Sequence, residues 1–458
     1  MISFLEQLVA SLWNRLRGRE RGAWLEQGSL DLGTRVADGE STGRHVSISD
    51  TRRTMHIAVL GKTGSGKSSF LRHLAEQDIE AGRGFLHFDF HGDATAHLLR
   101  KINAQERKHR RHLDAKLVLV DPTDSIVSVG FNPLEMPSPD FMRVAEVTGL
   151  LKRRWGLDHF GARTEELLRN SLFVLAANRL TLVELGLFLS NTSFRSTCLK
   201  QVPNLDVRQY FEERYDAASE PMRATMREPI LNKTSAFTAD SRFRHIVGQA
   251  RSTFSLLDAM DHGMWVIVNL EKGKLGEQAP TLGSLILSVV KNALFARKTR
   301  TLFSLYCDEI QNLVAYGSGI ETLLSEARKF GVGVITANQF LDQYPPEVRA
   351  AILSVGTQVF FQLTGQDAAQ VANALDGGRP LTERLKNLPQ RHFIAKTGSE
   401  RFEEVRVPRV HELSVDPTDL VNRVRYTKGR VRAHIERDIT ERQAAFTKKA
   451  DEVLDGWE

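Results

Sequence analysis

The chain has 458 residues, of which 41% are hydrophobic and 26% are charged. This composition is ordinary for a soluble globular protein with a sizeable core, and the length suits about two to four domains. The formal net charge of +6 is modest for this length, so it permits a polyanionic partner without requiring one.

The two cysteines, Cys198 and Cys307, lie far apart in apolar surroundings. They exclude a disulfide framework or a zinc site and favour a reducing compartment. No apolar run approaches the roughly 18–20 residues that span a bilayer, and the N-terminus lacks the features of a signal peptide. We therefore expect a cytoplasmic protein without an integral membrane segment.

Residues 1–50 form a lead-in to the first domain. Apolar residues at helical spacing within 2–17, followed by arginines, predict an amphipathic helix with a basic end. This helix suits docking on a partner, contact with an anionic membrane surface, or packing on its own chain. Residues 30–55 are rich in Gly, Ser and Thr and are typical of turns and short strands.

Strands alternate with helical stretches in two parts of the chain, 51–137 and 259–400. The first part has apolar runs at 56–60, 84–90 and 116–120, and the second has them at 265–270, 301–307, 332–336 and 357–363. Such alternation predicts an α/β core with a mostly parallel twisted sheet that is covered by helices on both faces. Residues 138–258 show helical periodicity throughout and predict an all-helical insertion, and residues 401–458 predict a basic C-terminal tail with helices.

A phosphate-binding motif follows the first strand of this core. Residues 61–68 match the pattern G-x-x-x-x-G-K-[ST], and Ser69 opens the helix that comes next. Glycines let successive amide groups point at phosphate oxygens, and the helix offers its positive end to the same anion. The predicted ATP-binding residues are Gly61, Lys62, Thr63, Gly64, Ser65, Gly66, Lys67, Ser68 and Ser69. Lys67 would bring its charge to the β- and γ-phosphates, and Ser68 would offer its hydroxyl to Mg²⁺.

Two acids end the apolar run at 302–307. We expect this run to be a strand that neighbours the phosphate-binding loop. Asp308 would then hold Mg²⁺ through its water shell, while Glu309 would orient or deprotonate the attacking water. An ordinary strand-to-loop boundary is the alternative for this pair, and the phosphate motif favours the catalytic interpretation.

Three further features suggest chemistry, each with an alternative. Gln339 ends another apolar strand and would sense the γ-phosphate or the attacking water, or else hydrogen-bond the loop. Arg328 would reach a neighbouring subunit's nucleotide, or remain a solvated helix end. Alternation along an extended strand places four polar residues on one face, where they would form either a metal cluster or the polar lining of the nucleotide site. These residues are His87, Asp89, His91 and Asp93.

The helical insertion holds basic residues that would suit DNA phosphates. They are interleaved with acids, so charge pattern alone does not establish DNA binding. The set comprises Arg223, Arg227, Lys233, Arg242, Arg244 and Arg251.

The ordered set of motifs resembles the HerA/FtsK superfamily of ring ATPases, and most closely the soluble ATPase domain of conjugative coupling proteins of the TraG/TraD type. The matching features are the 61–68 loop, Asp89–Asp93 (where Asp-Pro-His-Gly-Asp is common), 131–134, 268–276, Asp308-Glu309, 326–328 and the strand ending at Gln339. The resemblance covers roughly residues 55–370. Two departures are Phe90 in place of the common Pro and the lack of N-terminal transmembrane helices.

This resemblance implies a RecA-like core, a homo-hexameric ring, and ATP-driven movement of single- or double-stranded DNA in conjugative transfer, type IV secretion or HerA-like DNA processing. It implies catalytic roles for Glu309 and Gln339, a finger role for Arg328, and magnesium ligation by Ser68 and Asp308. Partners would be a relaxase, secretion or nuclease-type protein, with recruitment to the inner membrane face as one alternative. The rival functions are an ATP-dependent scaffold or secretion ATPase that recruits proteins without DNA, and a nuclease-associated regulatory ATPase.

Overall fold

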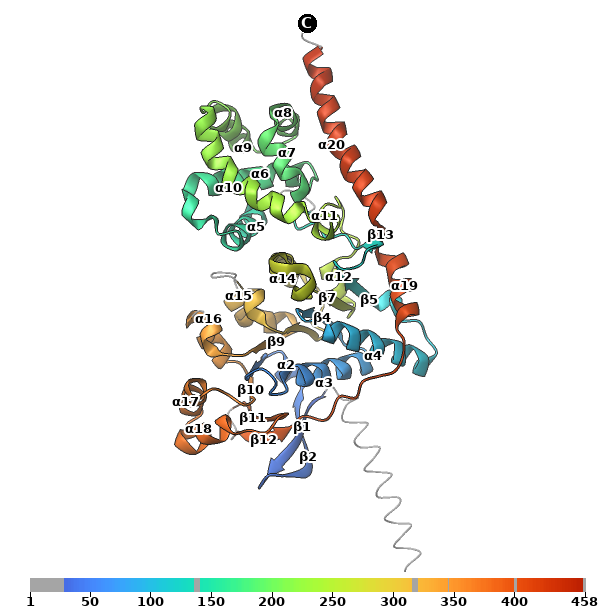
Figure 1. The fold of residues 1–458 in the computed structure, drawn as a ribbon, viewed down its shortest axis with the longest axis vertical. Helices are drawn as coiled ribbons and strands as arrows, with labels where there is room; N and C mark the ends of the chain where they lie inside the picture. Colours follow the sequence, from blue (N-terminus) through green and yellow to red (C-terminus); the bar gives the residue numbers. More distant parts are fainter. Residues whose placement is uncertain (1–28, 136–140, 315–319, 345, 399–401, 456–458) are drawn as a thin grey trace, which may run out of the picture.

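The computed structural model describes residues 29–135, 141–314, 320–344, 346–398 and 402–455. The helix predicted within 2–17 lies outside these residues. One large mixed sheet forms the centre of the fold (Figure 1). From edge to edge its strands are β2 (Glu40–Ser49), β1 (Ser29–Ala37), β12 (Glu403–Arg406), β11 (His392–Thr397), β10 (Thr357–Phe360), β3 (Ile57–Leu60), β9 (Val332–Asn338), β8 (Phe303–Cys307), β4 (Gly84–Asp89), β7 (Trp265–Asn269) and β5 (Leu117–Val120).

The strands from β10 to β5 run parallel, and the remaining strands join them in antiparallel pairs. Alternation along each parallel strand sends side chains to opposite faces of the sheet, with a core on either face. In β7, Trp265 and Ile267 face one core while Val266 and Val268 face the other. Both faces are therefore covered, which confirms the predicted fold class of an α/β P-loop NTPase core.

Helices α3 (Lys67–Glu80), α4 (Asp93–His109) and α19 (Thr418–Lys428) pack on one face of the sheet. Helices α12 (Leu256–Asp261), α14 (Ala279–Ala296), α15 (Ile320–Glu326) and α16 (Pro346–Leu353) pack on the other. The remaining helices outside the insertion and the C-terminal stretch are α2 (Asp50–Arg53), α13 (Lys272–Leu275), α17 (Gly365–Ala374) and α18 (Gly378–Lys386) among the described residues. Among the described residues, only Lys272–Ala296 is long and apolar enough to span a membrane, and most of it is buried inside the fold.

The hairpin β1–β2 is more regular than the short strands and turns expected for residues 30–55. It pairs through β12 with the main sheet, and Gly33 permits this approach because a Cβ atom there would lie 2.4 Å from the Arg406 carbonyl oxygen. Leu30 and Leu32 point into the core, whereas β2 buries only Ile48. A strand exposed along most of its length carries a weak apolar signal, so its extent was not evident from the sequence.

The helical insertion lies to one side of the sheet, beyond α14 (Figure 1, green). Its apolar side chains continue one of the two cores of the sheet, so the insertion and the sheet share a packed interface. Its helices are α5 (Phe141–Arg154), α6 (Gly161–Ala177), α7 (Leu185–Ser190), α8 (Thr192–Leu199), α9 (Leu205–Gln209), α10 (Glu220–Thr238) and α11 (Ser241–Val247).

The C-terminal stretch, predicted as a basic tail, is folded against both parts of the molecule. After α19, strand β13 (Arg430–Val431) pairs with β6 (Val127–Ser128), and α20 (Arg432–Asp455) then runs along the insertion (Figure 1, red). Ile435 and Ile439 of α20 are fully buried. Arg442 binds the buried Glu184 carboxylate at 2.7 Å. Apolar burial and paired charges therefore hold this segment in place.

Candidate nucleotide-binding site

The 61–68 loop joins the end of β3 to the start of α3. Gly64 and Gly66 adopt φ values of +78° and +119°, which favour glycine. At Gly61 a Cβ atom would lie 2.5 Å from the Phe361 Cβ atom, so a side chain has no room there. No side chain caps the N-terminus of α3, whose free amide groups remain directed at the space above the loop.

Lys67, the first residue of α3, turns its ammonium group back toward the loop. Its Nζ donates hydrogen bonds to the carbonyl oxygens of Gly61 and Lys62, the latter at 3.1 Å. Burial lowers the pKa of Lys67, while the nearby Asp308 and Glu309 oppose that shift. Because its hydrogen bonds within the described residues go to neutral carbonyl oxygens, this cation is suited to exchange them for phosphate oxygens.

Asp308 and Glu309 follow β8. The sequence led us to expect β8 directly beside β3, the strand that precedes the loop, but the two strands are not adjacent. Strand β9 lies between β3 and β8. Because all three strands are parallel, their carboxyl ends still meet at one edge of the sheet, and the acids face the loop across the end of β9. The expectation that β3 and β8 are adjacent was wrong. The order of strands in a sheet depends on which strands pair with each other, and no local sequence pattern encodes that pairing.

Asp308 has an unusual protonation equilibrium. Burial and the neighbouring Glu309 charge raise the pKa of its carboxyl group to about 6, against the opposing effects of His91 and Lys67. A buried carboxylate with too little compensating charge gains from a divalent cation.

Glu309 is fixed by side chains from three other places in the chain. Its Oε1 atom lies 3.2 Å from His91 Nε2 and accepts a hydrogen bond from Gln339 Nε2 at 3.1 Å. Its Oε2 atom accepts one from Asn312 Nδ2 at 3.0 Å. The His91 bond lowers the pKa of Glu309, and the same bond raises the pKa of His91 to about 9. The backbone of Glu309 is itself left-handed, with φ of +50°.

Gln339 connects the loop to this carboxylate. Its Oε1 atom accepts a hydrogen bond from Thr63 Oγ1 at 3.0 Å while its Nε2 donates to Glu309. A cavity of about 240 Å³ lies between the loop and the acids. Its lining comprises Thr63, Gly64, Gly66, Lys67, Ser68, Ser69, His91, Asp308, Glu309, Ala337, Asn338, Gln339 and Gln390. An ammonium group, free amides, a hydroxyl and a buried acid make this donor set fit a phosphate group with a divalent cation.

Three of the predicted loop residues do not line the cavity. Gly61 and Lys62 bind Lys67 through their carbonyl oxygens, and the buried Ser65 hydroxyl has no hydrogen-bond partner among the described residues. Gln390 was missed from the sequence. It precedes β11, and its Nε2 donates to the Gly64 carbonyl oxygen at 3.1 Å.

Arg328 lies away from this cavity. It belongs to the 3₁₀ turn Ala327–Phe330 before β9, at the edge of the sheet opposite the phosphate loop. There it is exposed and lines a cavity of about 640 Å³ together with Asp50 and Arg300. Contact with the nucleotide of its own chain is therefore excluded by position, and contact with a neighbouring subunit's nucleotide stays a prediction.

The face that alternates along 87–93 does not form a metal cluster. Asp89 accepts hydrogen bonds from the backbone amides of His91, Gly92 and Thr95 and thereby organises the start of α4. Burial lowers the pKa of His87 to about 4, and its ring stacks on Tyr306 at 5.5 Å. Of this set, His91 lines the nucleotide cavity, as the alternative of polar lining predicted for it.

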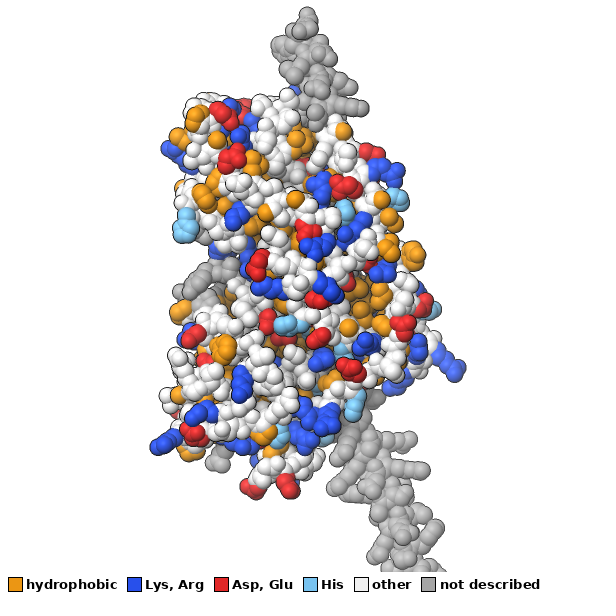
Figure 2. Space-filling view, viewed as in Figure 1, with side chains coloured by type: hydrophobic (Ala, Val, Ile, Leu, Met, Phe, Trp, Pro, Cys, Tyr) orange, Lys and Arg blue, Asp and Glu red, His pale blue; other side chains and the backbone are white. Residues whose placement is uncertain are grey.

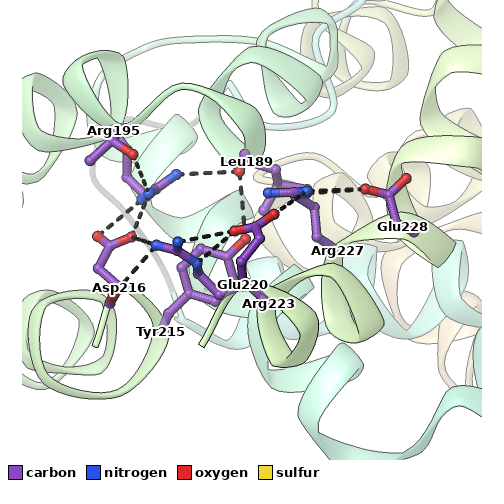
Figure 3. A network of polar contacts seen from close by, with 9 residues as sticks. Leu189, Arg195, Tyr215, Asp216, Glu220, Arg223, Arg227 and Glu228 are labelled. Carbon is purple, nitrogen blue, oxygen red and sulfur yellow. Dashed lines mark hydrogen bonds and ion pairs between the residues drawn. The ribbon is translucent and has the colours of Figure 1, made fainter. Parts of the chain in front are cut away.

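Most of the basic residues singled out in the insertion are already paired. Figure 3 shows Arg223 and Arg227 bound to Glu220, with further contacts to Asp216 and Glu228. Arg242 pairs with Asp240 and Arg244 with Glu436. On the face in Figure 2, charged side chains of both signs are interspersed. The positive charge of these four arginines is therefore balanced by neighbouring carboxylates, whereas Lys233 and Arg251 are exposed.

The fold and this site define a RecA-like P-loop ATPase core. The family model of the HerA helicase central domain matches residues 37–160. The DNA double-strand break repair helicase HerA of Sulfurisphaera tokodaii is 23% identical over 62% of this chain. The aligned region is 51% of that protein, so the chain spans about half the length of this relative. The predicted resemblance to HerA/FtsK-type P-loop ATPases is thereby confirmed.

Two solved structures with low sequence identity share this fold. The bacterial conjugative coupling protein TrwB, with its N-terminal segment removed, is 16% identical with a TM-score of 0.57, covering 84% of this chain and 95% of its own. VirB4 of Thermoanaerobacter pseudethanolicus is 13% identical with a TM-score of 0.53, covering 84% and 97%. TrwB has been solved with the ATP analogue ADPNP and with ADP and Mg²⁺. These are the ligands predicted from the 61–68 loop and Asp308.

Proposed function

We propose that the chain hydrolyses ATP and uses the energy to translocate DNA as a homo-hexameric ring. One observation carries the hydrolytic part. The Glu309 carboxylate is fixed by His91, Gln339 and Asn312 and faces the phosphate loop across one cavity. A carboxylate fixed opposite a phosphate-binding loop is arranged to activate water for phosphoryl transfer.

The roles of the residues follow from their positions. The loop amides and Lys67 would bind the phosphates, and Ser68 and Asp308 would hold Mg²⁺. A bound magnesium ion would offset charge on the phosphate oxygens. Glu309 would take the proton of the attacking water. Gln339 would orient that water, because it contacts both the loop and Glu309.

The motor part is supported by the match to the HerA central domain and by the fold shared with TrwB. In a ring, Arg328 would approach the nucleotide of the adjacent subunit from the edge opposite its own loop. We place the protein in the cytoplasm, or at the inner membrane face, with a relaxase, secretion or nuclease-type partner. The pathway would be conjugative transfer, type IV secretion or HerA-like DNA processing.

The test is ATP turnover measured with and without DNA for the wild-type chain and for three variants. Lys67→Ala should abolish nucleotide binding. Glu309→Gln should retain nucleotide binding but lose turnover by about 10²–10⁴-fold. Lys108→Ala, an exposed charge at the end of α4, is the matched control and should behave as wild type. Turnover that survives both site substitutions would overturn the assignment.

DNA dependence separates the motor from its rival. A translocase should turn over faster with DNA, and its DNA affinity should fall steeply with salt because phosphate contacts release counterions. Turnover that ignores DNA, without salt-dependent binding, would instead favour an ATP-dependent scaffold or secretion ATPase that recruits protein substrates.

A further inference from the structure

Arg154, the last residue of α5, reaches out of the helical insertion to the turn that follows Glu309. Its Nε donates to Ser284 Oγ of α14 at 2.9 Å, and its Nη2 donates to the backbone carbonyl oxygen of Asn312. Among the described residues, no carboxylate forms an ion pair with it. Burial lowers the pKa of Arg154 to about 10, so it is a cation stabilised mainly by neutral oxygens.

The turn that receives Arg154 is the one that holds the proposed catalytic carboxylate. It is a 3₁₀ turn, Ile310–Asn312, that begins directly after Glu309. Asn312 donates its side-chain amide to Glu309 Oε2 at 3.0 Å. Ser284 Oγ donates to the Leu313 carbonyl oxygen at 2.7 Å. Arg154 and Ser284 thus fix the successive carbonyl oxygens of Asn312 and Leu313. Because the backbone of Asn312 is held in this way, its side-chain amide is positioned to bind Glu309.

We propose that Arg154 is a positioning residue for Glu309, and that through it the seating of the helical insertion on α14 controls the turnover rate. The proposal rests on the proposed hydrolytic role of Glu309. Arg154 touches neither the phosphate loop nor the cavity lining, so its effect falls on the carboxylate and not on nucleotide affinity.

The contact of Arg154 with α14 lies beside a cavity. Arg154, Ser284 and Leu313 line a cavity of about 310 Å³ between α5 and α14. A second contact joins the same helices, an ion pair of Lys291 Nζ and Glu146 Oε1 at 2.9 Å. This pair belongs to the same interface and contacts neither Glu309 nor Asn312 in the described structure, so it provides a matched control.

The experiment measures kcat and KM for ATP, together with binding of a fluorescent ATP analogue, on the 458-residue chain. Arg154→Ala should lower kcat about tenfold or more, with KM and analogue affinity within about twofold of wild type. Arg154→Lys keeps the positive charge but loses the planar fork that reaches both acceptors, so it should recover part of kcat. Lys291→Ala should leave kcat within about twofold. Asn312→Ala should lower kcat as Arg154→Ala does, and the double variant should lose no more than either single one.

Two results would overturn the inference. One is an Arg154→Ala chain with wild-type kcat. The other is a loss of both kcat and analogue binding that is the same in Lys291→Ala as in Arg154→Ala. That result would show that either substitution disrupts the interface as a whole. A wild-type chain without any turnover would overturn the proposed function as well, whereas a wild-type chain that hydrolyses ATP and loses activity on Glu309→Gln isolates the test of Arg154.

Discussion

A buried ionic network joins the helix after the phosphate loop to the strand that ends in the two acids. Asp78 of α3 is fully buried and accepts hydrogen bonds from Arg53 Nη2 at 2.7 Å, Arg83 Nε at 2.8 Å and the Tyr306 hydroxyl at 2.7 Å. Arg53 is only 1% exposed and also donates to Ser304 of β8 at 2.7 Å. Burial alone would raise the pKa of Asp78, but the two guanidinium groups outweigh it and hold that pKa below 3.8.

Substituting Asp78 by Ala should therefore destabilise the fold strongly. It leaves the buried Arg53 guanidinium with one remaining carboxylate, the partly exposed Asp50 at 3.5 Å, so the loss of unfolding free energy should fall at the low end of about 3–5 kcal/mol. Tyr306→Phe removes one hydrogen bond to a charged group and should cost about 1.5–3 kcal/mol. Because Arg83 is 12% exposed and reaches water more easily, Arg83→Ala should cost less than Asp78→Ala.

Urea unfolding followed by circular dichroism would measure these free energies, with Lys108→Ala as the surface control. The depressed pKa of Asp78 also sets a pH dependence. Its contribution is fully present above the ordinary pKa of 3.8 and is lost as pH falls through the lower native value, so Asp78→Ala should lose less stability on acidification than wild type. An Asp78→Ala chain that unfolds within about 1 kcal/mol of wild type would refute the reasoning.

Three further outcomes are expected. The pKa of Asp308 is about 6, and its side chain binds a cation in the ionised form and not in the protonated form. Magnesium-dependent ATP binding should therefore weaken as pH falls through 6. Calorimetry that shows the same affinity at pH 7.5 and at about pH 5.5 would contradict this. Gln339→Ala should lower the single-turnover rate of hydrolysis about 10²-fold while analogue binding persists, and equal loss of both would assign Gln339 to nucleotide binding instead. Arg442→Ala removes the cationic partner of the buried Glu184 and should cost about 1.5–3 kcal/mol by urea unfolding; wild-type stability would show that this ion pair does not hold α20 in place.

The sequence by itself determined the two ends of the catalytic cavity. The loop from Gly61 to Ser68 needs a particular order of glycines, a lysine and a hydroxyl, and Asp308-Glu309 ends a strongly apolar run. Both are local patterns, with the chemistry and the backbone requirement contained in a few consecutive residues. The parallel core was predictable for the same reason, since buried strands show continuous apolar runs.

Only the tertiary structure decided which distant residues complete the site. Gln390 is 326 positions from Gly64, and Arg154 is 158 positions from Asn312, yet each pair is hydrogen-bonded. The insertion of β9 between the loop strand and β8, and the placement of Arg328 at the opposite edge, likewise follow from the order of strands in the sheet. Such contacts form because the whole chain folds so that it buries apolar area and pairs its buried polar groups. A short segment of sequence does not contain the distant partners on which this depends.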